Sequence, residues 1–142
     1  MVLCIGLIFW FVTRDPVVSR EGDRLDVQQP NAELIVAVEK ARGHVSEFIE
    51  ALRSKPSGAG GFGVIYPLRG DIGIEHVRIR VSEYRNGKFI GTLADQQNAG
   101  TNLKVGDRME IPQNEIDDWF YTLNGQLRGA FTKSVIGNLA KQ

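Results

Sequence analysis

The fold is decided by a stretch near the C-terminus, residues 105–132, which reads VGDRMEIPQNEIDDWFYTLNGQLRGAFT. Its first half predicts a short, half-buried strand that ends at Ile111, followed by a short helical turn that Pro112 can start. Its second half predicts a hairpin, because Asn124-Gly125 tolerates the positive φ angles of a type I′ turn. Thr132 is placed to cap a C-terminal helix. The stretch therefore predicts antiparallel strands and a short closing helix.

The composition fits one globular domain and excludes several classes of function. The chain has 142 residues, of which 42% are hydrophobic and 24% are charged, proportions that are ordinary for a globular domain. Basic and acidic residues both number 17, so the charge balance gives no support to nucleic acid as a partner. Cys4 is the only cysteine, which excludes an intramolecular disulfide and a cysteine-ligated zinc site. We predict no cofactor and no metal, because only His44 and His76 could join carboxylates in a metal site.

The first 30 residues carry the features of a targeting segment. Residues 1–12 contain no charge and would form a helix of roughly 18 Å, shorter than the roughly 30 Å core of a membrane. This length suits a signal peptide, so residues 1–19 are predicted to be a signal or membrane anchor and residues 20–30 a polar tether. The domain would be exported or anchored in the inner membrane, facing the periplasm, after contact with the membrane or the export machinery. Two alternatives stay open: a buried N-terminal strand or helix, and a cytoplasmic location favoured by the arginines after the apolar run.

Residues 31–142 are predicted to form a single α+β domain that begins with a long amphipathic helix. Asn31 can accept bonds from the first free amides, and an apolar stripe at spacings of three and four continues to about Arg53. Gly43 interrupts good helix formers at a cost of roughly 1 kcal/mol relative to alanine, so we expect it to mark a close approach to another backbone. His44 is expected to be a partly exposed surface residue.

The segments after the helix predict a curved, mostly antiparallel sheet of about five to six strands. A Gly-rich connection at 54–61 ends the helix. Alternating apolar residues predict strands at 62–68, 74–84 and 89–94, and Asn86-Gly87 predicts a tight hairpin. The expected architecture is the long helix packed on this sheet, with the short C-terminal helix closing the domain.

One predicted strand face carries three basic groups in a row. His76, Arg78 and Arg80 alternate with aliphatic residues in the strand at 74–84, so they point to the face opposite the aliphatic side chains. Such a pattern usually marks a solvated face. The alternative is a surface that binds an anionic group or an acidic patch of a partner protein.

Five segments of the chain carry a distinctive order and spacing. They are AR..VSEFIEAL (41–52), EHVRIRV (75–81), GTLAD (91–95), VGDRMEIPQNEIDDWFY (105–121) and GQLRGAFTKSVI (125–136). Together they resemble the YegJ-like family of bacteria, a domain of unknown function, over about residues 31–136. The resemblance implies a compact α+β domain, often exported or membrane-associated, and no established activity. Family members often carry an aromatic residue at the position of Arg78, so this strand face is expected to be more polar here.

Two kinds of function are compatible with these residues. The favoured one is a non-catalytic protein-binding module, similar to small bacterial immunity or envelope-associated proteins, with the Trp119 hairpin and the His76 face as its surface. The alternative is a small enzyme or anionic-ligand-binding domain. In that case Glu75 or Asp118 would act as acid or base while His76 and Arg78 stabilise negative charge.

Several observations favour the non-catalytic function. No nucleophile motif is present, and Glu75 and His76 are neighbours on a strand, which directs them to opposite faces. A metal site made of Asp117, Asp118 and His76 would lack any recognised ligand spacing. For Trp119, a core role beneath the hairpin is favoured over a ligand platform. The candidate ligand-binding or partner-binding residues are Glu75, His76, Arg78, Arg80, Asp118 and Trp119, with no catalytic residue assigned and no indication of the oligomeric state.

Overall fold

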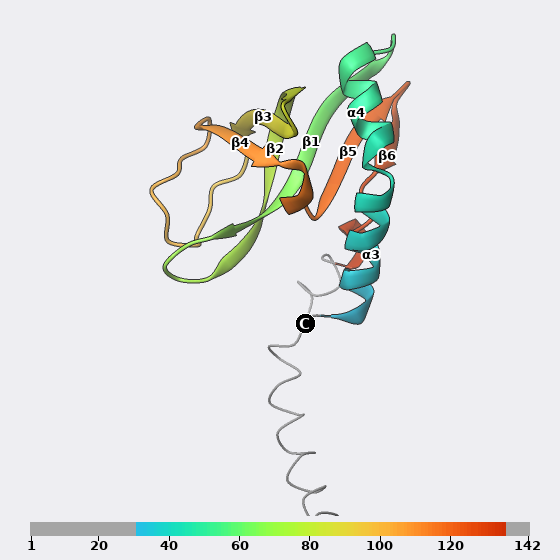
Figure 1. Cartoon of the computed structure of the whole chain (residues 1–142). Coiled ribbons are helices and arrows are strands. Elements are labelled where there is room, and N and C mark those ends of the chain that lie inside the picture. Colours follow the sequence, from blue (N-terminus) through green and yellow to red (C-terminus); the bar gives the residue numbers. More distant parts are fainter. Residues whose placement is uncertain (1–30, 136–142) are drawn as a thin grey trace, which may run out of the picture. The chain divides into compact units, whose positions relative to one another are not determined.

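The computed structural model describes residues 31–135 (Figure 1). The chain divides into two units, Met1–Asn31 and Ala32–Gln142, and the elements described below belong to the second. The predicted targeting segment at 1–19 and the tether at 20–30 lie outside the described residues. Within residues 31–135, no helix combines the length and the apolar composition that a membrane crossing requires.

Two helices precede a single six-stranded sheet. The helices are α3 (Ala32–Gly43) and α4 (Val45–Ser54), and a 3-10 helix, η1 (Gln113–Glu115), lies between two of the strands. The strands are β1 (Ala59–Arg69), β2 (Ile74–Arg85), β3 (Lys88–Leu93), β4 (Arg108–Pro112), β5 (Asp118–Leu123) and β6 (Gln126–Gly129). Their order in the sheet is β4-β3-β2-β1-β5-β6, and every neighbouring pair is antiparallel. The predicted α+β class and the number of strands are confirmed.

Both predicted tight hairpins form at their Asn-Gly pairs. The φ angles are 54° and 77° at Asn86 and Gly87, and 51° and 80° at Asn124 and Gly125. These positive values are the ones that a type I′ turn needs at its two central residues. At the C-terminal end, residues 133–135 are helical, and the rest of the predicted closing helix lies outside the described residues.

The predicted single long helix is not confirmed, because the helical segment breaks at His44. The His44 amide donates to the carbonyl of Ala41 at 3.2 Å, one residue short of the α-helical spacing. The carbonyl of Lys40 instead accepts a bond from Nδ1 of the His44 imidazole at 2.8 Å. The explanation expected for Gly43 is wrong: outside its own helix, no atom lies within 4 Å of the position that a Cβ would take. Gly43 therefore loosens the helix just before the break without packing closely on another backbone.

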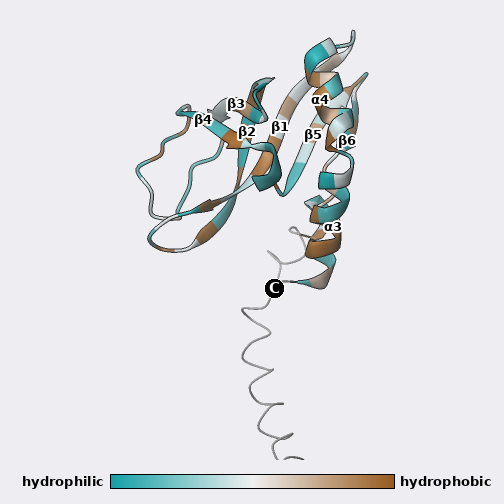
Figure 2. Cartoon of the chain, viewed as in Figure 1, coloured by the Kyte–Doolittle hydropathy of each residue, from teal (hydrophilic) through white to brown (hydrophobic). Residues whose placement is uncertain are grey.

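The core lies between the two helices and one face of the sheet. Phe48 of α4 is fully buried, and its ring centroid lies 5.4 Å from that of Phe89 and 5.5 Å from that of Trp119. Val77 and Ile79 of β2 are also fully buried on this face. Apolar residues recur along β1 and on the helices (Figure 2). Burial of these aromatic and aliphatic side chains is the main stabilising contribution to the fold.

Trp119 joins the sheet to the break between the helices. Its indole Nε1 donates to the carbonyl oxygen of Ala41 at 2.8 Å, and its ring stacks on Phe48 at an interplanar angle of 26°. The ring of Phe131 meets the indole edge-on at 5.5 Å. Trp119 is only 1% exposed, which agrees with the core role favoured from the sequence.

We expect Trp119→Ala to lower the free energy of unfolding by about 3–5 kcal/mol, the usual cost of deleting a large buried aromatic side chain. Trp119→Phe keeps an aromatic ring but removes the bond to Ala41, so we expect an intermediate loss of about 1–3 kcal/mol. Denaturant unfolding of the full chain measures both values. Equal stability of the unaltered chain and the Phe variant would show that the indole bond does not stabilise the helix break.

Candidate functional site

The face of the sheet opposite the helices carries the basic residues of β2. The helices contact β2 and β5 from one side, where Val77, Ile79 and Val81 are buried. The side chains of His76, Arg78 and Arg80 are exposed on the other side, as their alternation predicts. We call this second side the open face.

Phe120 lies across the middle of the open face. Gly63 of β1 is the register partner of both Arg80 and Phe120, so these two side chains flank the glycine on its two neighbouring strands. A Cβ at Gly63 would lie 2.3 Å from the ring of Phe120, which shows that the ring covers the glycine directly. The absence of a side chain at position 63 therefore leaves room for the outer end of the Phe120 ring between β5 and Arg80.

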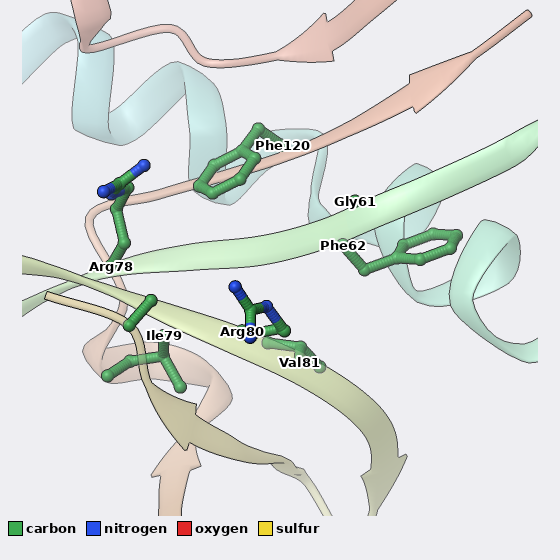
Figure 3. Close-up of a pocket in the computed structure, with 8 residues that line it drawn as sticks. Gly61, Phe62, Arg78, Ile79, Arg80, Val81 and Phe120 are labelled. Carbon is green, nitrogen blue, oxygen red and sulfur yellow. The ribbon is translucent and has the colours of Figure 1, made fainter. Parts of the chain in front are cut away.

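Two adjoining hollows form around this ring. The first has a volume of about 460 Å³ and is bordered by Arg78, Arg80 and Phe120, together with Gly61 and Ala94. In Figure 3 the side chains of Arg78 and Arg80 extend from β2 toward the side on which the ring of Phe120 lies. The second has a volume of about 430 Å³ and shares Arg78 and Phe120 with the first; its other lining residues include Ile65, Leu127, Ala130 and Lys133. The two hollows of the open face are thus lined by aromatic and aliphatic side chains and bordered by cationic ones.

Arg78 is held in place by Asp95, in the loop that follows β3. The guanidinium donates to Oδ1 of Asp95 through Nε at 2.8 Å and through the terminal nitrogen at 2.5 Å, and the Arg78 amide donates to Oδ2 at 2.9 Å. This side-chain bond raises the pKa of Arg78 and lowers the pKa of Asp95. Both groups are therefore charged at neutral pH, and Asp95 offsets the charge of Arg78.

Arg80 and Lys133 are not offset in this way. Neither forms a salt bridge with another residue in the range 31–135. Arg80 borders the first hollow and Lys133 the second, and both are exposed. These two groups contribute positive charge to the open face, and the buried carboxylate of Asp118, whose four donors are uncharged, contributes negative charge beside the second hollow.

His76 belongs to a separate cluster around Asp117, the residue just before β5 begins. Its Nε2 lies 3.0 Å from Oδ2 of Asp117, whose Oδ1 accepts a bond from Arg42 of α3 at 3.3 Å. Arg42 also donates through Nε to the carbonyl of Ile116 at 2.9 Å. Glu75 does not take part, because its carboxylate accepts the amide of Asn98 at 2.5 Å. The structure thus separates Glu75 from His76, as expected, and gives His76 a carboxylate partner that the six candidate residues did not include.

Asp118 has a structural role in the described residues. It is 1% exposed, and its carboxylate accepts the amides of Trp119 and Phe131 and both the amide and the hydroxyl of Thr132, at 2.7–3.1 Å. Four donors satisfy a buried carboxylate and hold the turn after β6 against β5. Its neighbour Trp119 points to the opposite face, into the core. Of the six candidates, Arg78, Arg80 and Asp118 therefore border the hollows, while Glu75, His76 and Trp119 lie elsewhere.

Three residues of the open face escaped the sequence analysis. Phe120, Leu127 and Lys133 were not selected, although Phe120 alternates with Trp119 and so had to occupy the face opposite the core. The described residues contain no group of three or more His, Cys, Asp or Glu that could hold a metal ion. The arrangement can bind an anionic or amphipathic group, and its acidic residues are occupied by internal hydrogen bonds.

We expect Asp118→Asn to lower the free energy of unfolding by roughly 1–3 kcal/mol, because an amide nitrogen would face one of the donors that the carboxylate now accepts. The exposed Asp71 provides a control, and Asp71→Asn should change stability by less than about 0.5 kcal/mol. Thermal and denaturant unfolding measure both. If Asp118→Asn is as stable as the unaltered chain, the four hydrogen bonds do not hold the turn as described.

Comparison with known proteins identifies the family. Residues 31–141 match a family described as "Uncharacterized protein conserved in bacteria (DUF2314)". The chain is 31% identical over 96 residues to "Uncharacterized protein YegJ" of Escherichia coli (strain K12), a match that covers 68% of this chain and 61% of that protein. No solved structure matches. The chain therefore belongs to the DUF2314 family, and the predicted YegJ-like membership is confirmed.

Proposed function

We propose that this domain is a non-catalytic binding module that holds an acidic segment of another protein on the open face of its sheet. The observation that carries the proposal is Arg80, an exposed guanidinium that has no salt bridge within residues 31–135 and that lies beside the ring of Phe120. Arginine and aromatic side chains are enriched at the centres of protein interfaces. The pair therefore has the composition of a recognition site.

The charge of the open face favours an acidic partner. Arg80 and Lys133 contribute positive charge at exposed positions, Asp95 is offset by Arg78, and the carboxylate of Asp118 is buried under four uncharged donors. A carboxylate of a partner can accept two parallel bonds from one guanidinium. The equal numbers of basic and acidic residues in the chain argue against a long polyanion such as nucleic acid, which needs an extended basic stripe.

The proposal includes a location in the cell envelope. The uncharged run at 1–12 supports an exported or membrane-anchored domain that faces the periplasm. A small binding domain on a tether suits an immunity-like role, in which the domain occupies a surface of a second protein and blocks it.

One observation favours the alternative of a small enzyme or anionic-ligand-binding domain. His76 and Asp117 form an exposed imidazole–carboxylate pair, and such a pair is the usual arrangement of a general base and the group that orients it. Arg42 donates to the other oxygen of the same carboxylate, so Asp117 binds both groups at once. This cluster is separate from the two hollows, so substitutions can distinguish the two functions.

We expect a blocked peptide that alternates Glu and Val to bind the full chain. Arg80→Glu should weaken this binding by about tenfold or more, because an attractive charge is replaced by a repulsive one. Arg69→Glu changes the net charge equally but lies at the end of β1, outside the lining of both hollows, and should bind like the unaltered chain. Fluorescence anisotropy measures the affinities, and thermal unfolding checks that both variants fold. Equal weakening by the two substitutions would reduce the effect to net charge and contradict the proposal.

The His76 cluster supplies a second test. His76→Ala and Asp117→Asn should leave the affinity for the Glu-Val peptide within about twofold, because neither residue borders either hollow of the open face. Turnover of a small molecule that His76→Ala abolishes, with the thermal midpoint unchanged, would instead support the enzyme.

A further inference from the structure

We propose that the acidic segment binds as an additional strand on the free edge of β6, so that its alternate side chains reach the second hollow. This inference rests on the proposed function and specifies how the partner is held: as an extended chain in which acidic and aliphatic residues alternate. Because β5 and β1 lie between β6 and Arg80 on β2, Arg80 would contact residues of the segment beyond those paired with β6, and the two contacts can be tested separately.

The two edges of the sheet differ in how they are protected. β4, at one edge, carries the salt bridge between Arg108 and Glu110 and ends at Pro112, which has no amide hydrogen to donate. Charged side chains and proline are the usual means by which an edge strand resists pairing with another chain. β6, at the other edge, contains no proline, and its one salt bridge, from Arg128 to Glu47, lies on the face covered by the helices, whereas Leu127 is on the open face. Among residues 31–135 no further strand pairs with β6, so this part of the chain leaves its edge open to strand addition.

The pairing of β5 with β6 determines which backbone groups are free. Across the Asn124-Gly125 turn, Leu123 pairs with Gln126 and Thr122 with Leu127, and further along the Ala130 amide donates to the carbonyl of Trp119 at 2.7 Å. Hydrogen-bonded and non-hydrogen-bonded pairs alternate along an antiparallel ladder. Ala130 is bonded to Trp119, so Arg128 and Gln126 are the other residues of β6 that bond to β5. The amide and carbonyl groups of Leu127 and Gly129, which lie between them, therefore point away from β5. With one donor and one acceptor on each residue, they offer about four backbone hydrogen bonds to a partner strand.

The side chains beside this edge favour an apolar residue flanked by acids. Leu127 is 48% exposed on the open face and borders the second hollow with Ile65 and Ala130, so an aliphatic side chain on an added strand would pack against it. Lys133 lies on the border of the same hollow and would attract a carboxylate. Because side chains on one face of a strand recur every second residue, an alternating acidic and aliphatic segment meets both requirements.

A second copy of this chain fits the edge less well than an acidic partner. Its own β6, Gln126–Gly129, contains no carboxylate that could pair with Lys133. The edge is also short, because positive φ angles of 80° at Gly129 and 58° at Ala130 turn the chain after four residues. Backbone pairing must therefore act together with the side-chain contacts in the hollow.

Amide hydrogen exchange on the full chain tests the strand addition directly. The probe is the blocked peptide that alternates Glu and Val, with the corresponding Lys-Val peptide as a control. On addition of the Glu-Val peptide, we expect the amides of Leu127 and Gly129 to exchange about tenfold more slowly or better, because a new acceptor covers them. The Lys-Val peptide should leave their exchange unchanged.

A pair of substitutions at one position separates the backbone from the side chain. Leu127→Pro removes an amide hydrogen that β5 does not use, and we expect it to weaken Glu-Val binding about tenfold more than Leu127→Ala, which keeps the amide and shortens the side chain. Thermal unfolding shows whether the Pro variant folds. If the Pro variant does not fold, the amide exchange of Leu127 and Gly129 in the unaltered chain tests the strand addition instead.

The outcomes distinguish the two claims. Binding that depends on Arg80 but leaves the exchange of Leu127 and Gly129 unchanged overturns the strand addition and keeps the proposed function. The same holds if Leu127→Pro folds and binds as tightly as Leu127→Ala. Failure of the Glu-Val peptide to bind the unaltered chain contradicts the proposed function, and strand addition with it.

Discussion

The bond from the indole of Trp119 to the carbonyl of Ala41 is the contact on which the rest of the structure depends, because it joins β5 to the point where the helical segment breaks. The same indole stacks on Phe48 of α4 and meets Phe131 edge-on, so one buried side chain contacts both helices and the turn after β6. With Trp119 fixed in the core, Phe120 must point to the open face. The position of Phe120 on the open face is thus a consequence of how the core is anchored.

Local signals in the sequence are sufficient for most of the fold. The Asn-Gly pairs and the alternation along β2 depend on neighbouring residues alone, and both predictions are confirmed. The helix break could not be predicted in the same way, because Val45 and Phe48 continue the apolar stripe across it. The side chain that bonds at the break, Trp119, is 78 residues from Ala41 in the sequence. The sequence pattern of the helix does not indicate this contact.

The candidate site was predicted only in part, for a similar reason. The alternation along β2 placed Arg78 and Arg80 on one face correctly. It could not show that Asp95, from a loop, offsets Arg78, while Arg80 has no salt bridge within residues 31–135. The adjacent carboxylates of Asp117 and Asp118 have different environments: one meets Arg42 at the surface, and the other is buried under four donors. Which carboxylate is available depends on tertiary packing, and composition and spacing give no information about it.

We propose that the open face, and not the face covered by the helices, recognises an acidic segment. The most direct measurement is a map of amide chemical-shift changes across the full chain as the Glu-Val peptide is added. We expect the largest changes at Arg80, at Phe120 and along β6, with small changes on α3 and α4. Changes concentrated on the helices, or around His76 and Asp117 with none at Arg80, would contradict it.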